Sequence, residues 1–474
     1  MFTVFNEELA QLAHGIRDRH QSFARGEWTE ESLAAHQLQE FRRTIAYVKE
    51  HSPFYGRHLA ACDPAAITSL SADELAAVPF TTKDDLRREF EAVLSLPMSK
   101  AWIFYETTGT TGRSTPCPRN NTDSLHNNTA LTVYYDTIFR QFGDEQVIGV
   151  SGPTELHAFG DTFGDVCRNL GHAVAKMWPH SPMVGYDRAL ETLRVLPATG
   201  LFSTPGMALS LAKKAYAAGL NPRRDFNLDV LMCTGELASP SLLENIGALW
   251  GARAYNALYA SQEASVMGAG GADGRLYTAP LLNLYEVIDP ESGLAVEPGA
   301  DGVRTGELVV TSLYQGSKPL VRYRTGDLVR LGAADPAATL PATSLEVLGR
   351  TRDGLVIGGH RISGYDLEEL VLSRPRGYLD YQLVIDAVDG QDELTLHLEV
   401  PSDRDGVSVD ESAIAEVVRE RLDVPVTVEY GTLSSVTTTG AMVSWKAARV
   451  EDRRLATPDG ERAAALALTS GRAQ

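Results

Sequence analysis

Short apolar runs alternate with helix-like segments through the middle of the chain, and this alternation restricts the possible folds more than any other feature. The expected strands cover residues 146–150, 200–203, 229–233 and 253–258, and the expected helices among them cover residues 206–218 and 240–250. Strands that are connected by helices usually lie parallel in one sheet, which the helices cover. The sequence therefore predicts an α/β fold with a largely parallel core.

The pattern changes on both sides of this core. Residues 5–50 have the apolar spacing of two amphipathic helices. After about residue 280 the pattern predicts a mixed β-subdomain, with strands at 284–288, 306–312 and 321–331. Beyond Arg350 come a glycine-rich segment, helices at 365–371 and 411–421, and strands at 381–385, 393–400 and 425–430. We therefore expect a large N-terminal domain of residues 1–350, a small α+β C-terminal domain of residues 351–460, and a disordered tail of residues 461–474.

Composition argues against several classes of protein. The 474 residues carry 43 Lys and Arg against 62 Asp and Glu, a net charge of -19, which would repel a nucleic-acid backbone. The four cysteines have no Cys-x-x-Cys spacing, so we expect free thiols rather than a zinc knuckle or a disulfide framework. The start of the chain lacks the pattern of a signal peptide, and no apolar run reaches 18 residues. We therefore expect a cytoplasmic protein without a membrane span.

A loop rich in threonine and glycine follows an expected strand at residues 101–105. It contains Thr107, Thr108, Gly109, Thr110, Thr111, Gly112 and Arg113. Glycine lets backbone N–H groups turn toward an anion, the threonine hydroxyls add donors, and the arginine adds a permanent charge. The loop differs from a Walker loop, because only two residues separate its glycines. Its composition predicts a phosphate-binding loop, and a solvated turn is the alternative.

Five further segments resemble motifs of one enzyme superfamily. In chain order they are His51-Ser52-Pro53-Phe54-Tyr55, Cys233-Thr234-Gly235-Glu236, Tyr255-Asn256-Ala257-Leu258-Tyr259-Ala260-Ser261-Gln262-Glu263, Pro319-Leu320-Val321-Arg322-Tyr323-Arg324-Thr325-Gly326-Asp327 and Gly349-Arg350-Thr351-Arg352-Asp353-Gly354. With the loop, they resemble the adenylate-forming acyl-CoA synthetases, and within that superfamily the phenylacetate-CoA ligase branch. The resemblance implies a large nucleotide-binding domain with a small mobile domain. It also implies that a carboxylic acid is activated by ATP and Mg²⁺ as an acyl-adenylate and is then transferred to the thiol of CoA.

The resemblance also implies roles for individual residues. Glu263 matches the glutamate that holds Mg²⁺, and Asp327 and Arg350 match the residues that contact the ribose. Tyr259, Gly235 and Glu236 match the adenine-binding segments. Lys446 matches the small-domain lysine that bridges the carboxylate and the α-phosphate, so the implied catalytic residues are Lys446, Glu263 and Arg113. The plainer alternatives are a surface glutamate, a turn aspartate, a core tyrosine and a solvated lysine.

The acyl group is expected between residues 156–160 and the residues around Gly235 and Tyr259. His157, Phe159 and Ala260 would then line its pocket, although a structural histidine is the alternative for His157. The family favours aryl or arylacetic acids, and its members are often homodimers. A small carboxylic acid and a second copy of the chain are therefore the implied partners, and neither nucleic acid nor a membrane is expected.

Several departures from the family pattern leave other functions open. Ala260 replaces a glycine, Gln262 replaces a hydroxyl residue, Arg352 occupies the hinge position, and the segment before Lys446 is altered. One alternative keeps the fold but forms an amide, or uses ATP and nitrite to diazotise an aromatic amine. A second alternative is a degenerate homologue that binds a nucleotide without turnover. The chain contains neither the Gly-x-Ser-x-Gly elbow of a serine hydrolase nor the His-Glu-x-x-His helix of a metallohydrolase.

Overall fold

Five parallel strands form the centre of the fold, as the alternation of strands and helices predicted. The structure is a computed structural model that describes residues 6–106, 115–333, 335, 337–433 and 448–454. The parallel strands are β3 (Val147–Ser151), β4 (Ala173–Lys176), β5 (Gly200–Ser203), β6 (Val230–Thr234) and β7 (Arg253–Ser261). The helices that follow them are α8 (Ala158–Asn169), α9 (Gly185–Val195), α10 (Pro205–Ala217), α11 (Pro222–Asp225) and α12 (Pro240–Trp250). The strands and helices predicted for this region are therefore confirmed.

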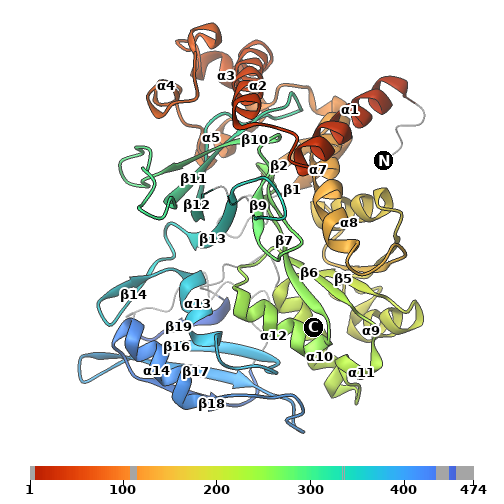
Figure 1. The fold of residues 1–474 in the computed structure, drawn as a ribbon, viewed down its shortest axis with the longest axis vertical. Coiled ribbons are helices and arrows are strands. Elements are labelled where there is room, and N and C mark those ends of the chain that lie inside the picture. Colours follow the sequence, from red (N-terminus) through yellow and green to blue (C-terminus); the bar gives the residue numbers. More distant parts are fainter. Residues whose placement is uncertain (1–5, 107–114, 334, 336, 434–447, 455–474) are drawn as a thin grey trace.

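Antiparallel strands extend the same sheet. They are β8 (Ser265–Gly270), β9 (Leu276–Thr278), β10 (Asn283–Ile288), β11 (Arg304–Ser312), β12 (Tyr323–Leu331) and β13 (Ser344–Arg350). The strand order is β10-β11-β12-β13-β9-β8-β7-β6-β5-β3-β4 (Figure 1). The strands predicted after residue 280 are present, but they do not form a sheet of their own, because β13 pairs with β9 at Ser344 and Tyr277. These partners are distant in the sequence, so no local pattern specifies their pairing.

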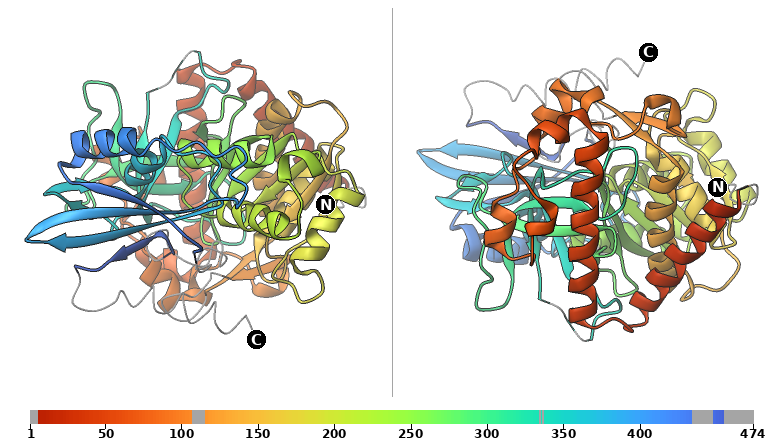
Figure 2. Two further views of the ribbon diagram at one scale, coloured as in Figure 1. Left: turned by 90° about the horizontal axis from the view of Figure 1, so that it is seen from below. Right: turned by 90° about the horizontal axis from the view of Figure 1, so that it is seen from above.

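Helices from the N-terminal part lie on the antiparallel half of the sheet, except the first of them, which packs against the helix of residues 121–139. They are α1 (Glu7–Ala24), α2 (Glu30–His51), α3 (Pro53–His58), α4 (Ala72–Ala76), α5 (Lys83–Arg88) and α6 (Phe90–Val93), with short 3₁₀ turns η2 (Pro64–Ala66) and η3 (Met98–Lys100). Phe41, Ile45 and Val48 of α2 are buried in the same core as the strand residues Leu308 and Val310. The view from above shows α2 lying across these strands (Figure 2). Both long helices predicted within residues 5–50 are therefore confirmed.

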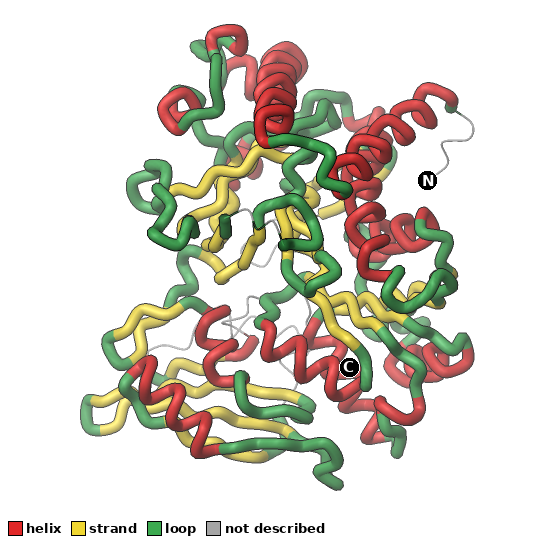
Figure 3. Tube along the Cα trace, viewed as in Figure 1, coloured by secondary structure: helices red, strands yellow, loops and turns green. Residues whose placement is uncertain are grey.

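A hairpin and a long helix connect this N-terminal part to the parallel strands. The hairpin consists of β1 (Ile103–Glu106) and β2 (Pro116–Arg119), in which Tyr105 lies opposite Cys117. The helix α7 (Asn121–Phe139) follows directly and packs against α1 and α8. Figure 3 shows these helices on one flank of the sheet, with α10 and α12 lower down along it. The hairpin therefore brings its side chains close to the strands that carry the predicted site.

The C-terminal part has the α+β pattern predicted from the sequence. It contains the hairpin β14 (Leu355–Ile357) and β15 (His360–Ile362), the helices α13 (Gly364–Leu372) and α14 (Glu411–Leu422), and the strands β16 (Asp380–Val388), β17 (Gln391–Glu399), β18 (Val426–Tyr430) and β19 (Val450–Asp452). The last four strands form one sheet in the order β18-β17-β16-β19. The C-terminal part thus has a smaller sheet of its own, which lies below the large one in Figure 1.

Carboxylates of α13 join this smaller part to the N-terminus of α12. Glu368 accepts a hydrogen bond from the backbone N–H of Ser239 at 2.7 Å, and Glu369 accepts one from Ser241 at 2.8 Å. The amide of Asn245 bonds the backbone of Tyr378 in both directions. Carboxylates are favourable at a helix N-terminus, because its first N–H groups lack partners within the helix. In this structure, these contacts hold the C-terminal part against α12.

Two further predictions concern cysteines and membrane spans. All four cysteines are free thiols, as expected, and Cys117, Cys167 and Cys233 are buried. Among the helices of the described ranges, none combines the length and the apolar composition that a bilayer crossing needs.

Candidate active site

Three motif residues meet in one buried corner. Asp327 of β12 lies opposite Arg350 of β13, and the Arg350 Nε atom is 2.9 Å from the Asp327 Oδ1 atom. The hydroxyl of Tyr259 on β7 donates a hydrogen bond of 2.6 Å to Asp327 Oδ2. Gly326 has φ +74°, and the β12–β13 pairing shifts register after Leu328, so the strand is irregular around Asp327. The corner therefore joins residues from three strands around one carboxylate.

Burial and the nearby Arg350 have opposite effects on the carboxylate of this corner. Burial raises the pKa of Asp327, while Arg350 and the Tyr259 hydroxyl act in the opposite direction without cancelling the rise. Burial also raises the pKa of Tyr259 well above its usual value, so its phenol keeps its proton and donates to the carboxylate. A carboxylate with two acceptor oxygens can accept hydrogen bonds from two neighbouring hydroxyls. The corner thus has the chemistry of the predicted ribose contact.

Glu263 lies in the turn after β7 and pairs with a lysine that the sequence analysis did not single out. The Nζ atom of Lys83, at the start of α5, is 3.0 Å from the Glu263 Oε1 atom. Burial alone would raise the pKa of Glu263, but Lys83 and Lys318 outweigh it and hold the pKa below its usual value. Glu263 therefore remains ionised at neutral pH. The capping box Thr82–Asp85 is visible in the sequence, but it predicts only a helix start, not this ion pair.

A small cavity adjoins Glu263 and contains charged groups of both signs. Its lining includes Cys117, Arg119, Asp123, Gln262, Glu263 and Lys318. Lys318 Nζ is 3.4 Å from Cys117 Sγ, and the Gln262 Oε1 atom is buried without a hydrogen-bond partner among the described residues. Lys83, Lys318 and Arg119 thus gather near Glu263, and Asp123 is a second carboxylate in the same cavity. Three cations against two carboxylates leave this part of a chain with net charge -19 locally favourable to an anion.

Gly235 and Glu236 follow β6 and form the turn that leads toward α12. Gly235 has φ +86°, which a residue with a side chain rarely adopts. Glu236 accepts a hydrogen bond of 2.8 Å from the backbone N–H of Gly206, at the N-terminus of α10. Burial raises the pKa of Glu236. The structure thus shows an anchoring contact for Glu236, and the adenine contact of this segment stays a prediction.

The three residues predicted for the acyl pocket lie in different environments. His157 caps α8, and its Nδ1 accepts a hydrogen bond of 3.2 Å from the Phe159 N–H. Burial, with a smaller contribution from Arg119, lowers the pKa of His157 to about 4, so its ring is neutral at neutral pH. The Phe159 ring is buried, and a Cβ atom on Gly152 would lie 2.4 Å from it. Ala260 is exposed on β7, and a substrate contact of these residues stays a prediction.

Several predicted residues lie outside the described ranges, so the structure does not place them. They are Thr107, Thr108, Gly109, Thr110, Thr111, Gly112, Arg113 and Lys446. The described parts of the same hairpin, β1 and β2, lead into the loop from residue 106 and out of it at residue 115.

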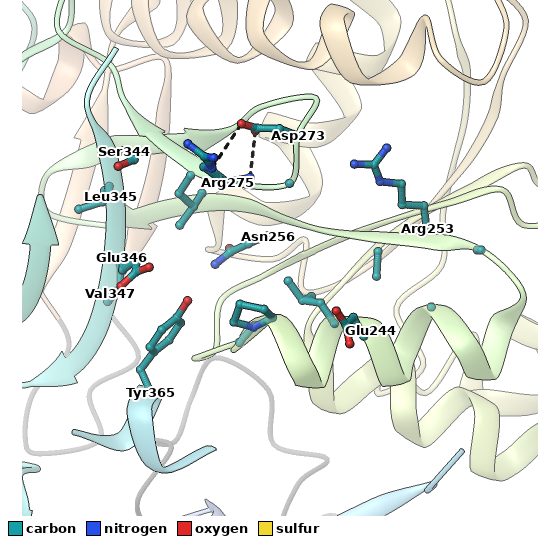
Figure 4. Close-up of a pocket in the computed structure, with 18 of the residues that line it drawn as sticks. Glu244, Arg253, Asn256, Asp273, Arg275, Ser344, Leu345, Glu346, Val347 and Tyr365 are labelled. Carbon is teal, nitrogen blue, oxygen red and sulfur yellow. Dashed lines mark hydrogen bonds and ion pairs between the residues drawn. The ribbon is translucent and has the colours of Figure 1, made fainter. Parts of the chain in front are cut away.

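A larger cleft, of about 800 Å³, lies between α12, β7, β13 and the start of α13 (Figure 4). Its lining includes Arg253, Asn256, Asp273, Arg275, Glu346 and Tyr365, with charges of both signs. Asp273 and Arg275 pair at 3.6 Å within it. None of the predicted site residues lines this cleft, whereas Glu263 lines the small cavity. Size alone therefore does not identify the reactive centre.

Comparisons with known proteins agree with these motifs. The chain is 28% identical to a phenylacetate-coenzyme A ligase of Thermus thermophilus over 388 residues, which cover 78% of this chain and 82% of that protein. It is 26% identical to the phenylacetate-coenzyme A ligase of Pseudomonas putida over 390 residues, with the same coverage. No protein-family model matches the chain.

The fold is also similar to that of a solved acyl-CoA ligase. A 2-hydroxyisobutyryl-CoA ligase in its postadenylation state superposes with a TM-score of 0.71 and 22% identity, over 93% of both chains. The same ligase with CoA in the thioesterification state superposes with a TM-score of 0.62, over 94% of this chain and 93% of that chain. The resemblance predicted from the sequence is confirmed: the chain is a relative of the phenylacetate-coenzyme A ligases and has the fold of an adenylate-forming acyl-CoA ligase.

Proposed function

We propose that this protein uses ATP to activate a carboxylic acid as an acyl-adenylate and then transfers the acyl group to the thiol of CoA. One observation carries the proposal. The ribose-type corner of Tyr259, Asp327 and Arg350 lies beside the Glu263–Lys83 pair, so motif residues from distant segments form one continuous site. Glu263 is close enough to Asp327 to contribute to the rise in its pKa, and both carboxylates contribute to the raised pKa of Tyr323.

The chemistry requires two anions to meet. A carboxylate oxygen of the acid attacks the α-phosphorus of ATP, a new C–O–P linkage forms, and pyrophosphate leaves. The thiolate sulfur then attacks the acyl carbon, AMP leaves, and the thiol proton passes to solvent. Lys83 and Lys318 supply positive charge that lowers the repulsion in the first step. Fixed charges of this kind stabilise a transition state because they need no rearrangement during the reaction.

The residues present fit Mg²⁺ as the companion of ATP. The ion is commonly held by one or two carboxylates together with substrate phosphates. Glu263 is a buried carboxylate that stays ionised, and within the described ranges no group of three or more His, Cys, Asp or Glu side chains could hold an ion by itself. Mg²⁺ bound at Glu263 would neutralise phosphate charge.

The remaining roles rest on the family resemblance. We propose that residues 107–113 hold the phosphates and that residues 351–460 form the mobile small domain, hinged after residue 350.

We also propose that the protein acts in the cytoplasm as a homodimer. Light scattering during gel filtration should give twice the mass of the chain, and a monomeric mass would refute the dimer.

The substrate and acceptor are best identified together. Pyrophosphate release should be measured with a panel of aryl and aliphatic acids and aromatic amines, each with CoA, an amine acceptor or nitrite. We expect release with an acid and formation of a CoA thioester, detected by mass spectrometry. Release that needs nitrite and an aromatic amine would instead identify diazotisation, and an amide product would identify amide synthesis. An absence of release with every pair, although ATP binds, would support the degenerate homologue.

Lys446 provides a separate test of the first half-reaction. Replacement Lys446→Ala should reduce acid-dependent exchange of pyrophosphate into ATP by about 100- to 1000-fold, because it removes one charge from the transition state. ATP binding, measured by calorimetry, should persist. Lys100, an exposed lysine of a different segment, provides the control variant Lys100→Ala. Full exchange in the Lys446 variant would remove this residue from the mechanism.

A further inference from the structure

Arg119 is a buried cation that makes no hydrogen bond to a carboxylate of the described residues. It ends β2, and only 9% of the residue is exposed. Its Nε atom has no hydrogen-bond partner among the residues that the structure describes. The guanidinium lies over the ring of Tyr105, 4.9 Å from the ring centre. A cation–π contact offsets only part of the cost of removing an arginine from water. An anion that completes the environment of Arg119 is therefore to be expected.

The acidic residue Asp123 is near Arg119 but has other hydrogen-bond partners. Asp123 of α7 lines the same small cavity, but its Oδ2 atom accepts hydrogen bonds from the backbone N–H groups of Asn120, at 2.8 Å, and Ser317, at 3.0 Å. Burial raises the pKa of Asp123, and the nearby Arg119 only reduces this rise. Asp123 thus anchors the N-terminus of its own helix and the loop before β12.

Arg119 lies between the two functional regions of the site. On one side it lines the cavity that contains Glu263 and Lys318. On the other side it is close enough to His157 to lower the pKa of that ring. The described residues therefore run from the ribose-type corner, through Glu263 and its lysines, to Arg119 and then to His157. In the proposed reaction, the carboxylate that attacks phosphorus must lie between the phosphates and the acyl pocket.

We propose that Arg119 binds the carboxylate of the acid substrate and orients it for attack on the α-phosphate. This inference rests on the proposed function. Arginine suits the role better than lysine, because its planar fork can bind both oxygens of a carboxylate at once. In the proposed function, Lys83 and Lys318 near Glu263 serve the phosphates. The substrate carboxylate is therefore the anion left for Arg119.

The test separates binding of the acid from binding of ATP. Acid-dependent pyrophosphate exchange should be measured for Arg119→Gln and Arg119→Lys while the acid and ATP are varied in turn. We expect Arg119→Gln to raise the KM for the acid about 100-fold, as expected for lost charged hydrogen bonds, and to change the KM for ATP less than about threefold. Arg119→Lys should recover part of the loss. Inhibition by pyrophosphate should stay unchanged in both variants.

Arg253 provides a matched control. Its guanidinium also lies over a tyrosine ring, 4.8 Å from the centre of Tyr255, but Arg253 begins β7, whereas Glu263 follows the other end of that strand. Arg253→Gln should leave both KM values unchanged, and melting temperatures should show that all three variants fold. A rise in the KM for ATP or weaker pyrophosphate inhibition, with the acid KM unchanged, would show that Arg119 binds phosphate and would overturn the inference. Unchanged kinetics in Arg119→Gln would overturn it too, whereas a wild-type protein without any acid-dependent exchange would refute the proposed function itself.

Discussion

Replacement of Glu263 by glutamine is expected to lower the rate of adenylate formation by about 100- to 1000-fold, the range found when one preorganised electrostatic group is removed. Glutamine keeps the size of the side chain but removes the charge that pairs with Lys83 at 3.0 Å. It also removes the carboxylate that we assign to Mg²⁺. The measurement is acid-dependent pyrophosphate exchange at several Mg²⁺ concentrations, and we expect the variant to need more Mg²⁺ for its residual activity.

Two further variants decide what Glu263 does. If Glu263 only positioned Lys83, the variants Lys83→Met and Glu263→Gln would lose similar activity and both would keep the wild-type Mg²⁺ requirement, and that outcome would contradict the role in holding Mg²⁺. Glu399 provides the control, because it also pairs with a lysine, Lys213, at 2.6 Å and is largely buried. Glu399→Gln should retain most of the activity. A comparable loss in that variant would mean that any broken Glu–Lys pair disturbs the enzyme.

Much of the fold could be predicted because its elements have local signals. The parallel strands are short apolar runs, and α12 begins with a capping serine and a proline. The continuity of the large sheet could not be predicted in the same way. It depends on the pairing of β9 with β13, and β9 has only three residues, too few for a periodic pattern.

The candidate site shows the same division between local and distant information. Asp327, Arg350 and Tyr259 were predicted because each lies in a motif that can be compared with a family. Lys83 and Arg119 lie outside those motifs, and single charged residues in a sequence usually belong to solvated surfaces. Only the folded chain shows that Lys83 contacts Glu263 and that Arg119 is buried beside the same cavity. Their roles depend on tertiary contacts, which residue type alone does not specify.

Asp327→Asn should weaken ATP binding about 10- to 100-fold, because each hydrogen bond to a charged acceptor is worth about 1.5–3 kcal/mol. The amide keeps one acceptor oxygen, but it loses the charge that attracts Arg350 and the second acceptor for the ribose hydroxyls. Calorimetric titration with ATP measures the effect. Asp335→Asn is the control, because Asp335 also pairs with an arginine, Arg275 at 3.0 Å, but lies on the surface. That variant should bind ATP like the wild type.

Stability should respond to Asp327→Asn in the opposite direction from binding. The pKa of Asp327 in the folded protein is raised, mainly by burial. A raised pKa means that the folded state favours the protonated form, so the contribution of this group to stability is full at low pH and is lost as the pH rises through the folded pKa. At neutral pH the ionised carboxylate therefore costs stability, and the neutral asparagine should keep or raise the melting temperature, since Arg350 is half-exposed and water can hydrate it. A lower melting temperature together with unchanged ATP affinity would show that Asp327 has a structural role and not a ribose-binding one.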